Sequence, residues 1–169
     1  MKKVKPSEPA IAHAGTVSEL ESHLGFWLRY VSNHVSGQFA SMVEANGVSV
    51  SEWVALRALY PAGHTGSTRV FSAADLMDAL GMTKGAVSKI VTRLEDKGLV
   101  RRVIVDTDKR AQQIMLTKAG MALVPTLAAS ADQNDQAFFG HLSATERKEL
   151  MSSMKLIVSM CGLKQLPVD

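Results

Sequence analysis

Apolar residues recur at intervals of three and four from Leu20 to Val43, the spacing that aligns side chains on one face of an α-helix. The run ends before Gly47, a residue type that readily adopts the left-handed conformation closing a helix. The pattern therefore predicts one long amphipathic helix within residues 18–47. Residues 1–17 contain lysines and prolines without this period, so we expect a flexible N-terminal tail there.

Three shorter helices are predicted next, because each of three apolar periods follows a good N-cap sequence. The cap signals are the pairs Ser49/Glu52 and Ser72/Asp75 and the single residue Thr83. A glycine turn at Gly81 separates the second helix from the third, which ends at Lys97-Gly98. Two short helices joined by such a turn form a helix-turn-helix.

A β-hairpin is predicted directly after the helix-turn-helix. Residues 99–105 are rich in β-branched side chains, residues 106–110 are polar, and residues 111–116 become apolar again. Helical periods then return in residues 117–139 and, after a Ser143 cap, to the end of the chain. The expected fold is mainly α: a winged helix-turn-helix in residues 48–116 with a β-hairpin wing, between an N-terminal helix in 18–47 and C-terminal helices in 117–169.

Charge is concentrated in one part of the chain. Residues 84–118 contain nine basic and four acidic side chains, a net charge of +5, whereas the whole chain carries only +3. The remainder is therefore weakly acidic, at −2. A basic segment on a nearly neutral body predicts a polyanionic partner, and its overlap with the helix-turn-helix favours double-stranded DNA.

The helix in residues 83–97 has one apolar face and one small, polar face. If Val87 faces the core, then Ile90, Val91 and Leu94 share its side at 100° per residue. Glycine, serine, threonine and lysine lie opposite, and such residues let a helix enter the major groove and reach base edges. The residues predicted to contact DNA, including those of the following hairpin, are Thr83, Lys84, Gly85, Ser88, Lys89, Thr92, Arg93, Arg101, Lys109 and Arg110.

From Leu80 to Gly120 the chain resembles the MarR family of bacterial regulators. The most specific matches are Leu-Glu-Asp-Lys-Gly-Leu-Val at 94–100, Asp-x-Asp-x-Arg at 106–110 and Leu-Thr-x-x-Gly at 116–120. The resemblance implies a homodimer formed by the first and last helices, with the second helix of each helix-turn-helix in a major groove and each wing in a minor groove. It also implies that Arg110 is the wing arginine, held by Asp106 or Asp108.

Aromatic and polar residues on the first two helices form a candidate effector site for a small aromatic or anionic ligand. They are Trp27, Tyr30, His34, Trp53 and Arg57. Many proteins of the resembled family bind small aromatic acids in this region. An equally good interpretation is that the two tryptophans anchor the core and that the other three residues are ordinary surface positions.

The sequence gives little support for catalysis, metal binding or redox chemistry. The five histidines have no metal-ligand spacing, and no nucleophile elbow, phosphate loop or dinucleotide motif occurs, so we expect no enzyme, no cofactor and no metal. The single cysteine, Cys161, is expected to be a buried structural thiol rather than a redox switch. The chain shows no secretory signal or membrane span, which together with the single cysteine favours the cytoplasm.

The sequence thus predicts a ligand-responsive repressor that binds a palindromic operator as a homodimer. The alternative is a non-specific or architectural DNA-binding protein, for which the basic segment alone would suffice.

Overall fold

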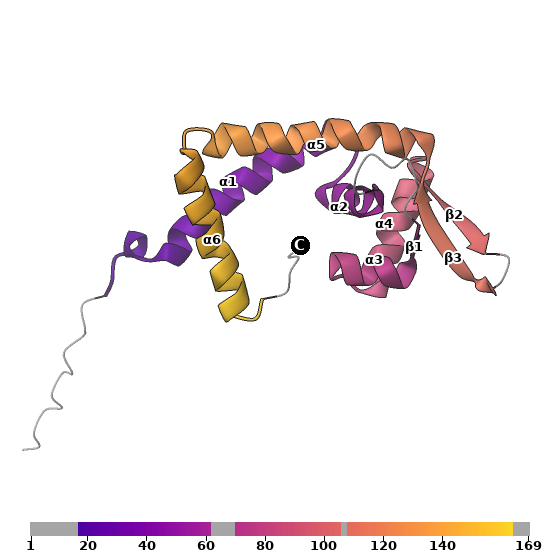
Figure 1. Cartoon of the computed structure of the whole chain (residues 1–169), viewed down its shortest axis with the longest axis horizontal. Coiled ribbons are helices and arrows are strands. Elements are labelled where there is room, and N and C mark those ends of the chain that lie inside the picture. Colours follow the sequence, from indigo (N-terminus) through magenta and orange to yellow (C-terminus); the bar gives the residue numbers. More distant parts are fainter. Residues whose placement is uncertain (1–16, 62–69, 106–107, 164–169) are drawn as a thin grey trace, which may run out of the picture. The chain divides into compact units, whose positions relative to one another are not determined.

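The structure, a computed structural model, is mainly helical with one small antiparallel sheet (Figure 1). It describes residues 17–61, 70–105 and 108–163, with the side chains of residues 104–112 outside the description. The elements in chain order are η1 (Leu20–Ser22), α1 (Leu24–Glu44), α2 (Val50–Leu59), β1 (Phe71–Ser72), α3 (Ala73–Leu80), α4 (Lys84–Asp96), β2 (Val100–Val105), β3 (Asp108–Leu116), α5 (Lys118–Phe139) and α6 (Ala144–Met160). The predicted fold class, a winged helix-turn-helix flanked by N- and C-terminal helices, is confirmed.

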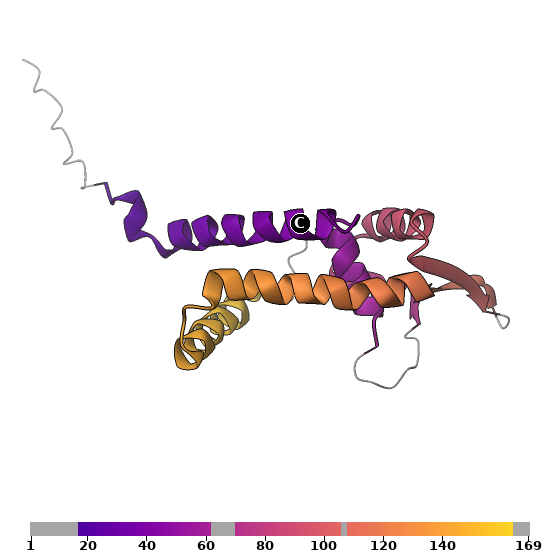
Figure 2. The same cartoon turned by 90° about the horizontal axis from the view of Figure 1, so that it is seen from above.

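The chain divides into two compact units, residues 1–34 and 35–169. The boundary falls inside α1, and each unit is described by itself. The second unit contains the helix-turn-helix, the sheet, α5 and α6. In both views of it, the β2–β3 hairpin projects beyond α3 and α4 (Figures 1 and 2), as a wing does.

Helix starts follow the cap signals of the sequence. At α2, α3 and α6 a serine side chain accepts from the backbone N–H three residues on, and the acidic residue there bonds back to the serine N–H. The Thr83 hydroxyl accepts from Ala86 N–H at the start of α4. Gly81, with φ 63°, closes α3 in the left-handed conformation that glycine adopts without steric cost. These local signals therefore place the turn of the helix-turn-helix where the sequence predicts it.

The sheet has three strands in the order β1-β3-β2. Strands β2 and β3 form the predicted hairpin, pairing Val100 with Leu116 and Arg102 with Ile114. Strand β1 adds a third member, with Phe71 opposite Ile114. The sequence predicted only a short apolar segment before the next helix, because a two-residue strand is too short to show a period of two.

The core of the second unit lies where α2, α3, α4 and the sheet meet. The predicted inward face of α4 is confirmed, since Val87, Ile90, Val91 and Leu94 are all buried. They belong to the same apolar cluster as Leu56, Leu59, Leu76 and Leu80 of the two preceding helices. Removing this much apolar surface from water is the main force that holds α4 with its polar face outward.

The expectation of a buried Cys161 was wrong, because this thiol is exposed. Cys161 is the C-cap residue of α6, and no residue of that helix is buried in the single chain. The sequence correctly predicts a helix here. Burial of Cys161 would require a second surface that covers α6.

Candidate nucleic-acid interface

The outward face of α4 presents every residue that the sequence assigned to it. Thr83, Lys84, Gly85, Ser88, Lys89, Thr92 and Arg93 are all exposed. An added Cβ at Gly85 would meet no atom within 4 Å, so the first turn of α4 is open. A helix with two lysines and small polar residues on its open face can approach a major groove closely and donate hydrogen bonds to base edges.

Arg102 ties β2 to α4, a contact that the sequence pattern did not predict. Its Nη1 donates to Glu95 Oε2 at 2.6 Å, and its Nη2 donates to Thr92 Oγ1 at 3.1 Å. The Arg102 N–H also donates to Glu95 Oε1 at 3.3 Å. Thr92, which we predicted to contact DNA, is therefore already held by the wing strand. The spacing of seven between Glu95 and Arg102 crosses a helix end and a turn, so no helical or strand period could reveal it.

Arg101 lies on the other face of the sheet from Arg102, because successive side chains of a strand alternate. It is exposed, and its register partner is Met115. Lys84, Ser88, Thr92 and Arg102 line one hollow of about 390 Å³, whereas Arg101 lines a second one of about 740 Å³ with Lys118 and Met121. The structure thus separates Arg101 from Lys84, Ser88 and Thr92.

The wing residues lie at the end of the hairpin. Asp106 is outside the described residues, and Asp108, Lys109 and Arg110 begin β3, with side chains outside the description. The backbone pairs Val105 with Asp108, with a register shift between Ile104 and Val105. The roles of Arg110 as the wing arginine and of the two aspartates as its supports stay predictions.

The candidate effector residues belong to both units. In the first unit, the Tyr30 ring lies 4.6 Å from the His34 ring and 6.3 Å from that of Trp27, centre to centre. In the second unit, Trp53 is buried against Phe39, with ring centres 6.5 Å apart, whereas Arg57 is exposed. Burial of Trp53 fits its interpretation as a core anchor, and an effector site at these residues stays a prediction.

Within residues 17–61, 70–105 and 108–163, no group of three or more His, Cys, Asp or Glu side chains could hold a metal ion. None of the helices in these ranges is both long and apolar enough to cross a membrane.

Comparison with known proteins shows similarity to one family of regulators over part of the chain. A MarR family profile matches residues 46–111, which contain the helix-turn-helix and most of the hairpin. The transcriptional regulator HosA of Escherichia coli O127:H6 is 31% identical over 84 residues, covering 50% of this chain and 62% of HosA. In this segment the chain is similar to the MarR family. The sequence resemblance is therefore confirmed on the segment that carries α2 to β3.

Two further proteins are similar over more of the chain. A putative transcriptional regulatory protein for the hcr operon of Thauera aromatica is 28% identical over 137 residues, covering 80% of this chain and 79% of that protein. The structure of the S. aureus MepR–DNA complex shares the fold at a TM-score of 0.69 and 23% identity, covering 82% of this chain and 98% of MepR. HosA is a transcriptional regulator and the Thauera protein a putative one, in agreement with the prediction of a regulator rather than an enzyme. The match to HosA spans less than two thirds of that relative's length.

Proposed function

We propose that this protein is a transcriptional regulator that binds operator DNA through α4 and the β2–β3 wing. The observation that carries the proposal is the outward face of α4, where all seven residues predicted to contact DNA are exposed beside a buried apolar face. The solved complex of MepR with DNA supports the same use of the shared fold. In this proposal α4 reads base edges, and the wing contacts phosphates and the minor groove.

The regulator acts as a homodimer. Large apolar side chains are exposed along α6, among them Leu150, Met154, Ile157 and Met160. The first unit exposes a second such set, including Leu20, Leu24 and Leu28. Apolar surface of this extent on terminal helices is typical of an interface between copies of one chain. A two-fold dimer carries two α4 helices, which can occupy two half-sites of a palindromic operator about 34 to 36 Å apart.

The dimer functions as a repressor in the cytoplasm, blocking a promoter by occupying its operator. A small aromatic or anionic effector binds near Tyr30, His34 and Arg57 and releases the DNA. The Tyr30 side chain in the first unit and the Arg57 side chain in the second are each exposed, so both the aromatic ring and the guanidinium are open to a ligand. An effector acts by favouring a half-site spacing that no longer matches successive major grooves.

The test is a comparison of specific with non-specific binding. An operator is first selected from a random duplex library, and the affinity of the protein for it is compared with that for a scrambled duplex of equal length. A regulator binds the operator about 10³-fold or more tightly. Equal affinities would instead establish the alternative, an architectural or non-specific DNA-binding protein.

A further inference from the structure

Among the residues that the structure describes, three helices begin with complete capping boxes, and the box of α2 differs from those of α3 and α6. At α3 and α6, the acidic residues Asp75 and Glu146 are exposed, and their carboxylates accept from the cap serine. At α2, Glu52 is 2% exposed and has an additional partner, Lys97, from a distant part of the chain. The capping boxes of α3 and α6 form without a buried carboxylate or a lysine partner. Capping α2 therefore does not require that Glu52 be buried or bonded to Lys97.

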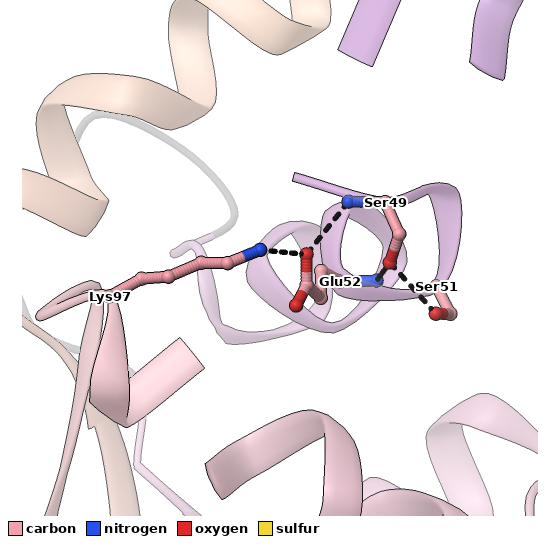
Figure 3. Close-up of polar contacts among 4 residues, drawn as sticks. All are labelled: Ser49, Ser51, Glu52 and Lys97. Carbon is pink, nitrogen blue, oxygen red and sulfur yellow. Dashed lines mark hydrogen bonds and ion pairs between the residues drawn. The ribbon is translucent and has the colours of Figure 1, made fainter. Parts of the chain in front are cut away.

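Glu52 forms hydrogen bonds with Ser49 and Lys97 (Figure 3). Its Oε2 accepts from Ser49 N–H at 2.7 Å and from Lys97 Nζ at 2.6 Å, and Glu52 N–H donates to Ser49 Oγ at 3.3 Å. Burial alone would raise the pKa of Glu52, but the hydrogen bonds from Lys97 and Ser49 outweigh it and lower the pKa below its ordinary value. The carboxylate is therefore charged, and its charge is matched inside the protein by the lysine.

Lys97 occupies a special place, because it is the C-cap residue of α4. Its backbone N–H donates to Arg93 O, so the lysine backbone is part of the last turn of the DNA-facing helix. Its side chain is 39% exposed and reaches Glu52 at the first turn of α2, 45 residues away in the sequence. The pair thus joins the C-terminal end of α4 to the N-terminal end of α2.

The orientation of α4 depends on which of its residues are fixed by contacts with neighbouring elements. The turn from α3 holds its N-terminal end, the apolar core its buried face, and Arg102 ties its C-terminal half to β2 through Glu95 and Thr92. Apolar contacts are not directional, so they allow a helix to pivot more freely than a short, charge-assisted hydrogen bond does. The bond from Lys97 to Glu52 adds a second directional tie, to α2 rather than to the sheet, and the two together limit the rotation of α4 that would displace Ser88, Lys89 and Thr92.

We propose that Glu52 is a positioning residue for operator selectivity, which it exerts through its ion pair with Lys97. The inference rests on the function proposed above. Base contacts are directional hydrogen bonds to particular base edges and carry the sequence information, whereas phosphate contacts are the same for every sequence. Removal of the pair should therefore reduce discrimination between operator and scrambled DNA and leave the non-specific component in place.

The experiment measures the ratio of operator to scrambled affinity for a set of variants, with stability measured by urea unfolding in parallel. Glu52→Gln keeps an oxygen that can accept from Ser49 N–H, and Lys97→Met removes the ammonium group. The double variant E52Q/K97M leaves no unpaired buried charge, so its stability should lie close to that of the wild type. Lys97→Arg preserves the charge, and Glu146→Gln is a matched control in the exposed box of α6.

We expect the ratio to fall about tenfold in Glu52→Gln, Lys97→Met and the double variant, near the lower end of the effect of removing one base-specific hydrogen-bonded pair. Lys97→Arg and Glu146→Gln should keep the wild-type ratio. Because the ratio compares two duplexes of equal charge, the altered net charge of a variant cancels. A folded double variant with the wild-type ratio would overturn the inference and leave the pair a purely structural role.

The experiment distinguishes an incorrect proposed function from an incorrect role for Glu52. If wild-type protein binds operator and scrambled duplexes equally, the proposed function is wrong. If the wild type discriminates and the folded double variant discriminates equally well, only the role of Glu52 is wrong.

Discussion

The carbonyl oxygen of Leu99 lies against Gly120, in the space that a Cβ atom at position 120 would need. The same carbonyl accepts from Thr117 N–H at 3.0 Å, and the Thr117 hydroxyl donates to Gly98 O at 2.7 Å. The hydroxyl also accepts from Gly120 N–H at 3.1 Å. The Leu-Thr-x-x-Gly motif is thus a backbone joint between the first turn of α5 and the turn that leads from α4 into β2.

Gly120→Ala should destabilise the protein by about 1 to 3 kcal/mol, the usual cost of forcing an extra carbon into a packed site. The clash is with backbone, which cannot rotate away as a side chain would. Gly85→Ala is the matched control, because Gly85 also lies in the first turn of a helix and has open space around its Cβ position. Urea unfolding of both variants checks the difference. Equal stabilities would show that the joint relaxes without cost.

The ion pair at Glu52 predicts a pH dependence of stability. The pKa of Glu52 is lowered from its ordinary value of 4.5, so the pair contributes fully above pH 4.5 and its contribution disappears as the pH falls through the lowered pKa. The free energy of unfolding of Glu52→Gln should therefore fall less between pH 6 and pH 3 than that of the wild type. Glu44→Gln, which removes an exposed carboxylate, is the control. Parallel pH profiles for Glu52→Gln and the wild type would contradict the prediction.

The exposed face of α6 predicts a dimer that a single charge can open. Ile157 is 46% exposed in the single chain, and a buried glutamate at this position in an apolar interface would be strongly destabilising. Ile157→Glu should convert the dimer to monomer in sedimentation equilibrium at micromolar concentration. Ser152→Glu lies five residues away, about 140° around the helix, and should leave the dimer intact. A wild-type protein that sediments as a folded monomer would reject the dimer itself.

The base-reading helix and the wing should respond differently to substitution. Lys89→Ala should weaken operator binding by about 1 to 3 kcal/mol, the cost of removing one bidentate interaction with a base, and reduce discrimination against scrambled DNA. Arg110→Ala should weaken binding to both duplexes and lower the slope of log affinity against log salt by about one for each phosphate that is no longer neutralised. A dimer has two wings, so the change in slope can approach twice that.

Salt titrations of the wild type, both variants and the control Lys148→Ala on α6 would test this difference. If Arg110→Ala bound both duplexes with the affinity and salt slope of the wild type, the wing assignment would be wrong, although the role of α4 could stand.

The local structure of this chain was predictable from the order of its residues. The caps at Ser49, Ser72, Thr83 and Ser143 and the inward face of α4 follow from interactions among residues three or four apart, which the order of residues specifies directly. The hairpin follows in the same way from two β-branched or apolar runs around a polar turn. Because these elements occur in a specific order, the fold class and the outward face of α4 were predictable.

The contacts between distant segments could not be predicted in this way. The pairing of β1 with β3, the Glu52–Lys97 ion pair and the close approach of Leu99 to Gly120 each depend on how separate elements pack against one another. Likewise, alternation separates Arg101 from Arg102, but only the packed sheet shows that Arg102 faces α4 and bonds to Glu95. No period in the sequence encodes these interactions, because their free energy arises from burial and charge pairing that exist only after the chain has collapsed.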